Sequence, residues 1–491
     1  MSSIYSSVNY SFEIDTILTD SKRNDVTVIA CDGCVGKCNG NTFGSKLLCH
    51  ECKKRTSAIL SNIPGVNVLH MSDFIGNGNE HEHYDYNSLR ELNAIKYKGF
   101  EIGYGISSYY ISLTRNLNPL ITHKLKRILD CWLDCSMTYA DIADKAITNQ
   151  YDSVYVINGR LFDSKPFQEI AFAKGTHVVL GESYPSLDGS VVRMNFDNVR
   201  VHSVKGNCDS IRKFWDSSKV PIEERRALAA SFYEKRANSI KTDDKVYTSG
   251  QIIGLMPDDW DDKKVNIGIF NSSEDEFAAI GGEFEKNNLF GSQMSGIRFI
   301  LDNIKDSNYH FYLRIHPNLM NIPYKYHKEL YKLPEEYGNI TVIPGNSPIS
   351  SYSLMRACNR VITFGSTMGV ESAYAGKTAM VMRPCFYYYL DVNFVPNSKE
   401  EVLDFIYGKI PFVPNKEDAL KYSYYYYNNE RGVSENRECA LTERKIRFWR
   451  SKSFSFWSMN MFCSELRMKY CHLLGLLGVL VAKAKIPKEE K

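Results

Sequence analysis

HFYLRIHPNL at residues 310–319 and NITVIPGNSPISSYSLMRACNRVITFGSTMGVESAYAGKTAMVM at residues 339–382 decide the fold class. This stretch contains three short apolar runs, at 311–315, 340–343 and 360–364, that are rich in β-branched or aromatic residues. Each run has the length of a strand and is followed by a polar, turn-forming cluster and then by a helical pattern. That alternation predicts βαβ units on a parallel sheet.

Polar clusters follow these strands at the place where parallel sheets bind their ligands, because the carboxyl ends of the strands meet the helix starts there. We expect residues of two clusters to contact a ligand: Arg314, His316 and Asn318 after the first strand, and Ser366, Thr367, Met368, Gly369 and Glu371 after the third. A further strand is predicted at 265–270, and its end offers amide and hydroxyl groups from Asn271, Ser272 and Ser273.

The cluster around Ser366 predicts an anion site. Ser366 and Thr367 can cap a helix that begins near Met368, and the N–H groups of its first turn would bind a phosphate. Glu371 follows on that turn, where the helix dipole tolerates a carboxylate, and it would accept hydrogen bonds from sugar hydroxyls. The alternative is that the Ser-Thr pair is only a cap and Glu371 only a first-turn carboxylate.

Together these motifs resemble the C-terminal, nucleotide-sugar-binding domain of bacterial glycosyltransferases with the GT-B fold. The likeness rests on His-Pro at 316–317 and Gly-Ser-Thr-x-Gly-x-Glu at 365–371, and it covers residues 262–410 well and the N-terminal half more loosely. It is closest to enzymes of capsular and surface polysaccharide synthesis, including the capsule Kdo-transferase-like group. The resemblance implies an α/β protein with two Rossmann-like doubly wound domains facing a central cleft, and a C-terminal helical tail.

The resemblance also implies the substrates. The donor would be a nucleotide-activated sugar, the acceptor a glycan or lipid-linked oligosaccharide, and the transfer would need no catalytic divalent metal. In the resembling enzymes the counterpart of His316 contacts the donor phosphate. His316 lies in a rigid turn before Pro317, and as a protonated ring or an N–H donor it would stabilise charge that develops on the leaving nucleotide.

Two carboxylates are candidates for the catalytic base. An inverting transfer needs one such group, to take the proton from the acceptor hydroxyl. Asp32 follows a strand predicted at 25–30, and Glu182 follows one at 176–180. The sequence does not separate the two, and Asp32 is equally suited to a turn. Arg160, after a strand at 153–158, would clamp a phosphate or a sugar carboxylate.

Length and composition limit the domain organisation and the partners. A chain of 491 residues predicts two domains, at 1–245 and 262–410, and a tail at 411–491. The net charge of +3 excludes a strong electrostatic case for nucleic acid. The first residues lack the pattern of a signal peptide, and no apolar run reaches about 18 residues, so we expect a cytoplasmic protein.

Five cysteines at 31–52 have the spacing C-x2-C-x3-C-x10-C-x2-C. Two closely spaced pairs suit a tetrahedral zinc site, with Cys34, Cys38, Cys49 and Cys52 as ligands. The alternative is a glycine-rich substrate loop with free thiols. We expect Cys131 and Cys135, one helical turn apart, to lie in the core, and we interpret residues 100–113 as an acceptor-side loop.

The tail has a different character. Residues 446–462 alternate aromatic and basic side chains, and a short apolar run at 473–482 precedes several lysines. This pattern predicts peripheral contact with the inner face of the cytoplasmic membrane, or equally a buried terminal helix. The functional alternatives to a transferase are a nucleotide-sugar 2-epimerase, a polyol-phosphate transferase and a non-catalytic, zinc-stabilised scaffold of a polysaccharide assembly complex.

Overall fold

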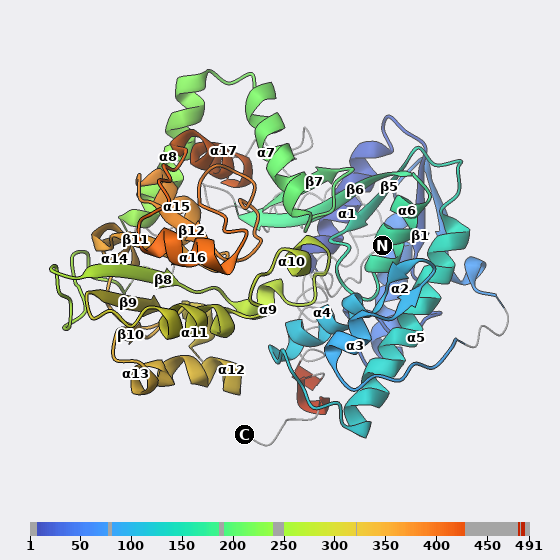
Figure 1. The fold of residues 1–491 in the computed structure, drawn as a ribbon. Coiled ribbons are helices and arrows are strands. Elements are labelled where there is room, and N and C mark those ends of the chain that lie inside the picture. The colour runs from blue at the N-terminus through green and yellow to red at the C-terminus, as the bar shows by residue number, and fades with distance from the viewer. Residues whose placement is uncertain are drawn as a thin grey trace.

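The computed structural model describes residues 7–76, 81–185, 191–238, 250–320, 322–427, 480–481 and 483–486. Two α/β halves lie next to each other, with the N-terminal half on the right of Figure 1 and the C-terminal half on the left. The short helices α9 (Glu274–Phe277) and α10 (Glu283–Lys286) lie between them.

The C-terminal half is built on five parallel strands in the order β10-β9-β8-β11-β12. Their bounds are β8 Val265–Phe270, β9 Tyr309–Arg314, β10 Ile340–Ile343, β11 Arg360–Thr363 and β12 Ala379–Val381. The strands are almost wholly buried, because helices cover both faces of such a sheet. The larger helices of this half are α11 Gln293–Asn303, α14 Ser351–Ala357, α15 Met368–Tyr374 and α16 Lys399–Ile406.

This strand order confirms the predicted α/β class and the doubly wound sheet. The chain steps outward from β8 to β9 and β10, then returns to place β11 on the other side of β8. The direction of winding therefore reverses between β8 and β11, which is where open parallel sheets form their ligand crevice. The small helices α12 (Lys325–Lys328) and α13 (Leu333–Glu336) lie between β9 and β10.

The N-terminal half has three small sheets in place of one. Strand β1 (Val26–Ala30) pairs in parallel with β2 (Val66–His70), and β5 (Ser153–Ile157) pairs in parallel with β6 (His177–Pro185). Strand β7 (Val191–Asp197) adds to β6 in the antiparallel direction. A hairpin joins β3 (Lys96–Tyr97) and β4 (Phe100–Glu101). The helices of this half are α1 Ser7–Asp20, α2 Lys46–Leu60, α3 Leu89–Asn93, α4 Gly103–Thr114, α5 His123–Ala146 and α6 Lys165–Ala173.

Helix α4 corrects the prediction of an acceptor-side loop at 100–113. Its residues are almost all buried, and its glycines serve packing between elements. A Cβ on Gly103 would lie 1.7 Å from the carbonyl oxygen of Leu92, and one on Gly105 would lie 3.0 Å from the backbone of Phe162. Only glycine therefore lets α4 approach α3 this closely.

Three helices connect the halves. Helices α7 (Val204–Ser217) and α8 (Ile222–Ala237) pack against the late helix α17 (Lys416–Tyr427), which also contacts α15 and β6. Tyr233 donates a hydrogen bond to the carbonyl of Ala419, and the rings of Phe232 and Tyr427 stack with centroids 4.0 Å apart. The structure thus places α7 and α8, which precede residue 245, against helices of the C-terminal half.

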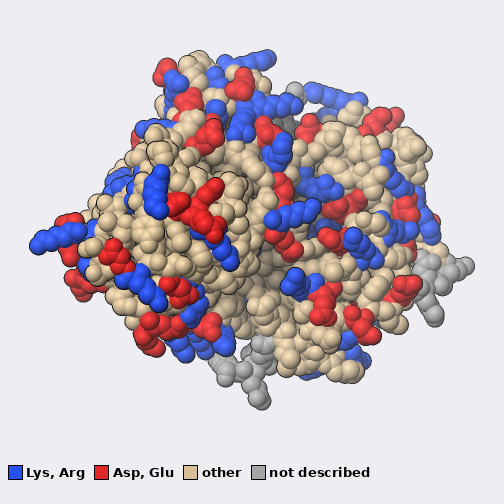
Figure 2. Space-filling view, in the orientation of Figure 1, with Lys and Arg blue, Asp and Glu red and all other residues tan. Residues whose placement is uncertain are grey.

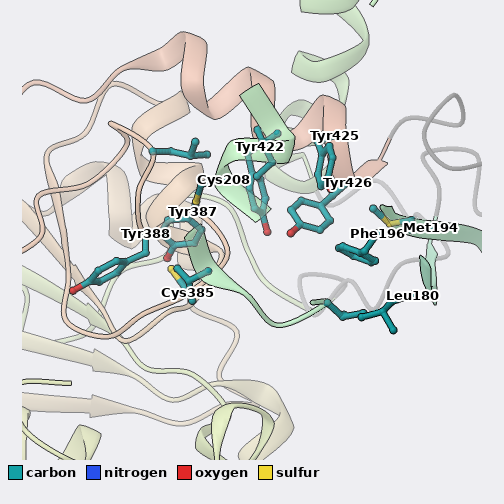
Figure 3. Packing of buried hydrophobic residues seen from close by; sticks show 14 of the residues in the cluster. Leu180, Met194, Phe196, Cys208, Cys385, Tyr387, Tyr388, Tyr422, Tyr425 and Tyr426 are labelled. Carbon is teal, nitrogen blue, oxygen red and sulfur yellow. The ribbon is translucent and has the colours of Figure 1, made fainter. Parts of the chain in front are cut away.

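A single hydrophobic core extends across both halves at this point. Figure 3 shows Leu180, Met194 and Phe196 from β6 and β7 together with Tyr425 and Tyr426 from α17. Cys208 from α7 and residues 385–388, which follow β12, complete the same cluster. The halves are therefore packed together and not merely joined by a linker.

The surface and the tail add two observations. Figure 2 shows basic and acidic side chains interspersed over the visible face. Of the helices in the described ranges, none has the length and apolar character that crossing a membrane requires. The predicted membrane contacts at 446–462 and most of 473–482 lie outside the residues that the structure describes.

Candidate functional site

The carboxyl edge of the C-terminal sheet meets two helix ends from the N-terminal part of the chain. Asn271 follows β8, His316 follows β9, and Glu371 lies on α15 after β11. The side-chain oxygen of Asn271 accepts a hydrogen bond from the backbone N–H of His316 at 2.7 Å, which joins the ends of neighbouring strands. Arg115, at the end of α4, and Arg236, at the end of α8, face this edge.

His316 is a neutral imidazole. Burial lowers its pKa to about 4, and the charges of Arg115 and Arg236 act in the same direction while Asp275 opposes them. Its Nδ1 accepts the backbone N–H of Asn318 at 3.2 Å, so the ring proton lies on Nε2. Of the two forms expected from the sequence, the N–H donor fits this lowered pKa.

Arg115 connects α4 to the ends of β8 and β9. Its guanidinium donates to Asp275 Oδ2 at 2.8 Å, to Ser273 Oγ at 2.6 Å and to the carbonyl of Asn318 at 2.7 Å. Its backbone has a φ of 59°, a left-handed conformation that ends the helix. One cation from the N-terminal half thus fixes two of the predicted ligand-binding loops.

Glu371 is a buried carboxylate beside Arg236. It is 2% exposed, and its Oε1 lies 3.4 Å from a guanidinium nitrogen of Arg236, whose side chain is 17% exposed. Neither carboxylate oxygen accepts a hydrogen bond of good geometry within the described residues, although the phenol of Tyr352 is close enough to interact with the carboxylate. The phenol of Tyr352 lies nearby, and its pKa is raised by burial and by the charge of Glu371. A carboxylate has about four acceptor sites, so Glu371 keeps capacity for ligand hydroxyls.

Two side chains that were predicted to contact a ligand, Arg314 and Ser272, instead form hydrogen bonds within the protein. Arg314 donates to the carbonyls of Pro344 at 2.7 Å and Ser347 at 3.1 Å, and burial lowers its pKa to about 10. The hydroxyl of Ser272 donates to the carbonyl of Phe364 at 2.7 Å. These hydrogen bonds join the ends of neighbouring strands, β9 to β10 and β8 to β11.

At the start of α15, where an anion site is expected, backbone N–H groups form hydrogen bonds within the protein. Thr367 makes no side-chain cap, and Ser366 accepts the N–H groups of Met368 (by its hydroxyl, 3.4 Å) and Gly369 (by its carbonyl, 3.0 Å). A Cβ on Gly369 would lie 2.4 Å from the hydroxyl of Tyr387. This glycine is therefore required for packing against the protein and not for the approach of a phosphate.

Arg160 and Glu182 come together where the halves meet. Arg160 donates to the carbonyls of Glu276 at 3.2 Å and Ala278 at 3.0 Å, and burial lowers its pKa to about 10. The guanidinium that was predicted to clamp a phosphate thus donates to backbone carbonyls that follow β8. Glu182 accepts a hydrogen bond from the side-chain amide of Asn158, and its negative charge acts on Arg160.

Asp32 has different surroundings. It lies after β1, near Ser72 and Cys34. Burial raises the pKa of its carboxyl, but hydrogen bonds from Ser72 and Cys34 outweigh that effect, so the pKa lies below its ordinary value. Asp32 is therefore ionised at neutral pH.

The predicted zinc site stays a prediction, although the described structure does not gather its four thiols as a ligand set. Cys34 lies with Asp32, and Cys49 accepts a hydrogen bond from Asn41 at 3.1 Å. Cys38 is half-buried and lies near Asp163 and Cys52, and Cys52 packs in the cluster of α1, β1 and β2. Throughout the described ranges, no three His, Cys, Asp or Glu residues converge as metal ligands would. The cysteines of this loop are free thiols.

Sequence reasoning missed the two arginines that approach His316. Arg236 belongs to the charged run at 221–236, which reads as a solvated helix face. A signal was present, because Ala229, Phe232 and Tyr233 form an apolar stripe that reaches Arg236 one turn later. For Arg115 the sequence offers no comparable signal.

The comparisons agree with the sequence resemblance. No protein-family model matches the chain, and no curated protein matches it by sequence. The beta Kdo 2,7 transferase of Thermosulfurimonas dismutans KpsC is 14% identical, with 63% of this chain and 89% of that chain covered and a TM-score of 0.35. The beta Kdo 2,4 transferase of KpsC is 11% identical, with 56% and 78% covered and a TM-score of 0.32.

An epimerase is similar to a lower degree. A putative UDP-N-acetylglucosamine 2-epimerase from Listeria monocytogenes is 12% identical, with 60% of this chain and 74% of that chain covered and a TM-score of 0.24. TM-scores this low carry no conclusion about the activity of this chain.

Proposed function

We propose that this protein is a glycosyltransferase that takes a sugar from a nucleotide-activated donor. The observation that carries the proposal is Glu371, a buried carboxylate with unused acceptor capacity, beside Arg236 at the strand ends. A carboxylate of this kind suits the hydroxyls of a ribose or a transferred sugar. It lies on α15, which follows β11, and β11 is next to β8 at the point where doubly wound sheets bind nucleotides.

The donor phosphate would lie near His316. The neutral ring presents an Nε2–H, and Arg115 and Arg236 raise the positive potential around it. A fixed N–H donor and buried cations stabilise charge that develops on a leaving phosphate without reorganisation during the reaction. Transfer in this scheme requires no divalent metal.

Glu182 is the base that we propose for the acceptor hydroxyl. Its charge acts on Arg160, which holds the backbone of Glu276 and Ala278, so Glu182 faces the junction of the halves. Asp32 lies instead with the cysteine loop. In an inverting reaction, Glu182→Gln would reduce kcat at least about 100-fold, the usual contribution of a general base, and Asp32→Asn would not.

The acceptor and the location follow from the same proposal. The acceptor would be a glycan or a lipid-linked oligosaccharide of bacterial surface polysaccharide synthesis, and the enzyme would act in the cytoplasm at the inner face of the membrane. An epimerase would interconvert free nucleotide sugars with no acceptor present. Incubation of the protein with a donor alone therefore separates the two activities.

The first experiment is a thermal-shift panel with CMP, CDP, UDP, GDP and dTDP. A nucleotide at about 100 times its Kd stabilises the native state by about 2.7 kcal/mol. We expect one nucleotide to raise Tm, and Glu371→Gln and His316→Gln each to weaken its Kd about tenfold or more, the effect of one lost hydrogen bond to a charged group.

The matched control is Glu336→Gln, which changes a surface carboxylate paired with Arg298. This variant should bind the nucleotide as the natural protein does. Absence of a shift with all five nucleotides would contradict the proposal. Equal behaviour of Glu371→Gln and Glu336→Gln would contradict the role of Glu371.

A further inference from the structure

One face of α5 contacts residues 35–37, within the cysteine-rich segment 31–52, at three points. Lys37 Nζ donates to Cys131 Sγ at 2.8 Å. One turn later Cys135 Sγ lies 3.8 Å from the carbonyl oxygen of Val35, and a further turn on Tyr139 donates to the carbonyl of Lys37 at 2.7 Å. The spacing of four residues places all three side chains on the same face of the helix.

The two cysteines differ in their surroundings. Cys135 is buried in the hydrophobic core, as the sequence predicted, whereas Cys131 is only half-buried. The ammonium of Lys37 against the sulfur of Cys131 favours a thiolate, which is the reactive form of cysteine.

The pKa directions agree with this geometry. A hydrogen bond from Cys135 lowers the pKa of Cys131, and Lys37 lowers it further, while the pKa of Cys135 is raised. Burial raises the pKa of the other described cysteines that depart from the ordinary value, which are Cys31, Cys34, Cys38, Cys208, Cys358 and Cys385.

We propose that Cys131 is a modification site, a nucleophilic thiolate that reacts with hydroperoxides and with soft electrophiles, with Cys135 as the resolving thiol. The sulfur of Cys131 attacks the terminal oxygen of a hydroperoxide, and the O–O bond breaks. The sulfur is oxidised to a sulfenic acid by two electrons, and the departing alkoxide or hydroxide takes a proton from solvent.

The second step forms a disulfide. Cys135 attacks the sulfenic sulfur, the S–O bond breaks, and water leaves with the thiol proton. Four residues along a helix rise about 6 Å, within the Cα separation that disulfides span, but their Cβ atoms lie about 5–6 Å apart, so this disulfide requires α5 to unwind locally. Either product removes the negative charge that Lys37 faces, so oxidation would weaken the attachment of the 35–37 loop to α5.

The test compares cysteines within the full-length chain. A short pulse of iodoacetamide at pH 6.5 is quenched, and each cysteine is quantified by mass spectrometry. We expect Cys131 to react about tenfold or more faster than Cys34, whose side chain is exposed but whose thiol pKa is raised by partial desolvation of the sulfur and by Asp32. Equal rates at the two positions would overturn the proposal without any variant.

Variants identify the cause of the reactivity. Lys37→Met should slow the alkylation of Cys131 about tenfold, whereas Lys37→Arg, which keeps the charge, should preserve it. Unchanged Tm values confirm that each variant is folded. If Lys37→Met reacts as fast as the natural protein, Lys37 does not activate the thiol.

Peroxide treatment tests the resolving role. The natural protein should lose two hydrogens in the peptide that carries both cysteines. In Cys135→Ser, a dimedone adduct should instead accumulate on Cys131. If Cys131 alkylates rapidly but yields neither product, the oxidation half of the proposal is wrong.

Discussion

At the scale of single residues, the sequence predicts that Arg314 binds a ligand and that Arg236 is solvated, and the structure shows different environments for both. Arg314 was expected to bind a ligand because it ends a strand, yet carbonyls from residues 344 and 347 occupy its donors. Arg236 was expected to be solvated, yet it pairs with buried Glu371. The sequence predicts which side chains reach the sheet edge, but it does not predict which donors distant loops will satisfy.

Arg314→Lys tests this structural role. An ammonium lacks the planar fork that reaches both carbonyls, so at least one buried acceptor would lose its partner. We expect the free energy of unfolding to fall by about 2–3 kcal/mol, measured by urea denaturation. Arg298→Lys, on a surface ion pair, should change it by less than about 1 kcal/mol. If Arg314→Lys were fully stable but lost nucleotide binding, Arg314 would be a ligand contact after all.

At the scale of elements, the sequence predicts the C-terminal strands well and the N-terminal half less well. Strands β8, β9 and β11 are mainly apolar, strand-length runs that are almost wholly buried, and such runs are easily recognised. Residues 100–113 were misread because glycine is typical of loops, whereas Gly103 and Gly105 serve close helix packing. Small residues that allow tight contact have no local signature, since the contact is made by distant segments.

The join between β11 and α15 offers a second test. Gly369→Ala would place a methyl group 2.4 Å from the hydroxyl of Tyr387 and 2.5 Å from the side-chain oxygen of Asn393. Overpacking of this kind costs about 1–3 kcal/mol in the free energy of unfolding. Gly338→Ala is the control, because a Cβ there has no neighbour within 4 Å and should leave Tm nearly unchanged. Equal Tm values for the two variants would contradict the packing role of Gly369.

At the scale of the whole molecule, the domain boundaries are the part that the sequence does not reveal. Helices α7 and α8 precede the predicted boundary but share a core with α15 and α17. Such long-range contacts leave no periodic pattern at the boundary itself. The predicted domain boundary between residues 245 and 262 therefore remains a proposal. In the packing, α7 and α8 group with the C-terminal helices α15 and α17.

Two histidines with lowered pKa values should make the protein sensitive to acid. Burial lowers the pKa of His316 to about 4 and that of His202 to about 3, from an ordinary value of 6.5. In the unfolded chain both rings take up protons below about pH 6.5, while in the folded chain they remain neutral until about pH 4 or lower. The free energy of unfolding therefore falls as the pH decreases through this window.

Urea titrations at pH 7 and pH 5 measure this loss. His316→Gln should reduce the difference between the two midpoints, whereas His123→Gln, at an exposed position, should leave the difference unchanged. An unchanged difference in His316→Gln would show that His316 does not contribute to acid sensitivity.

The packing of α8 against α17 also determines when the protein can finish folding during synthesis. Roughly 180 residues separate the end of α8 from the start of α17, and a ribosome needs about 10–40 s to add them. Throughout that interval Phe232 and Tyr233, which α17 helps to bury, lack this partner on the nascent chain. A ribosome-associated chaperone that binds exposed aromatic segments would bind α8 in this interval. A nascent chain stalled before residue 416 would stay bound to it.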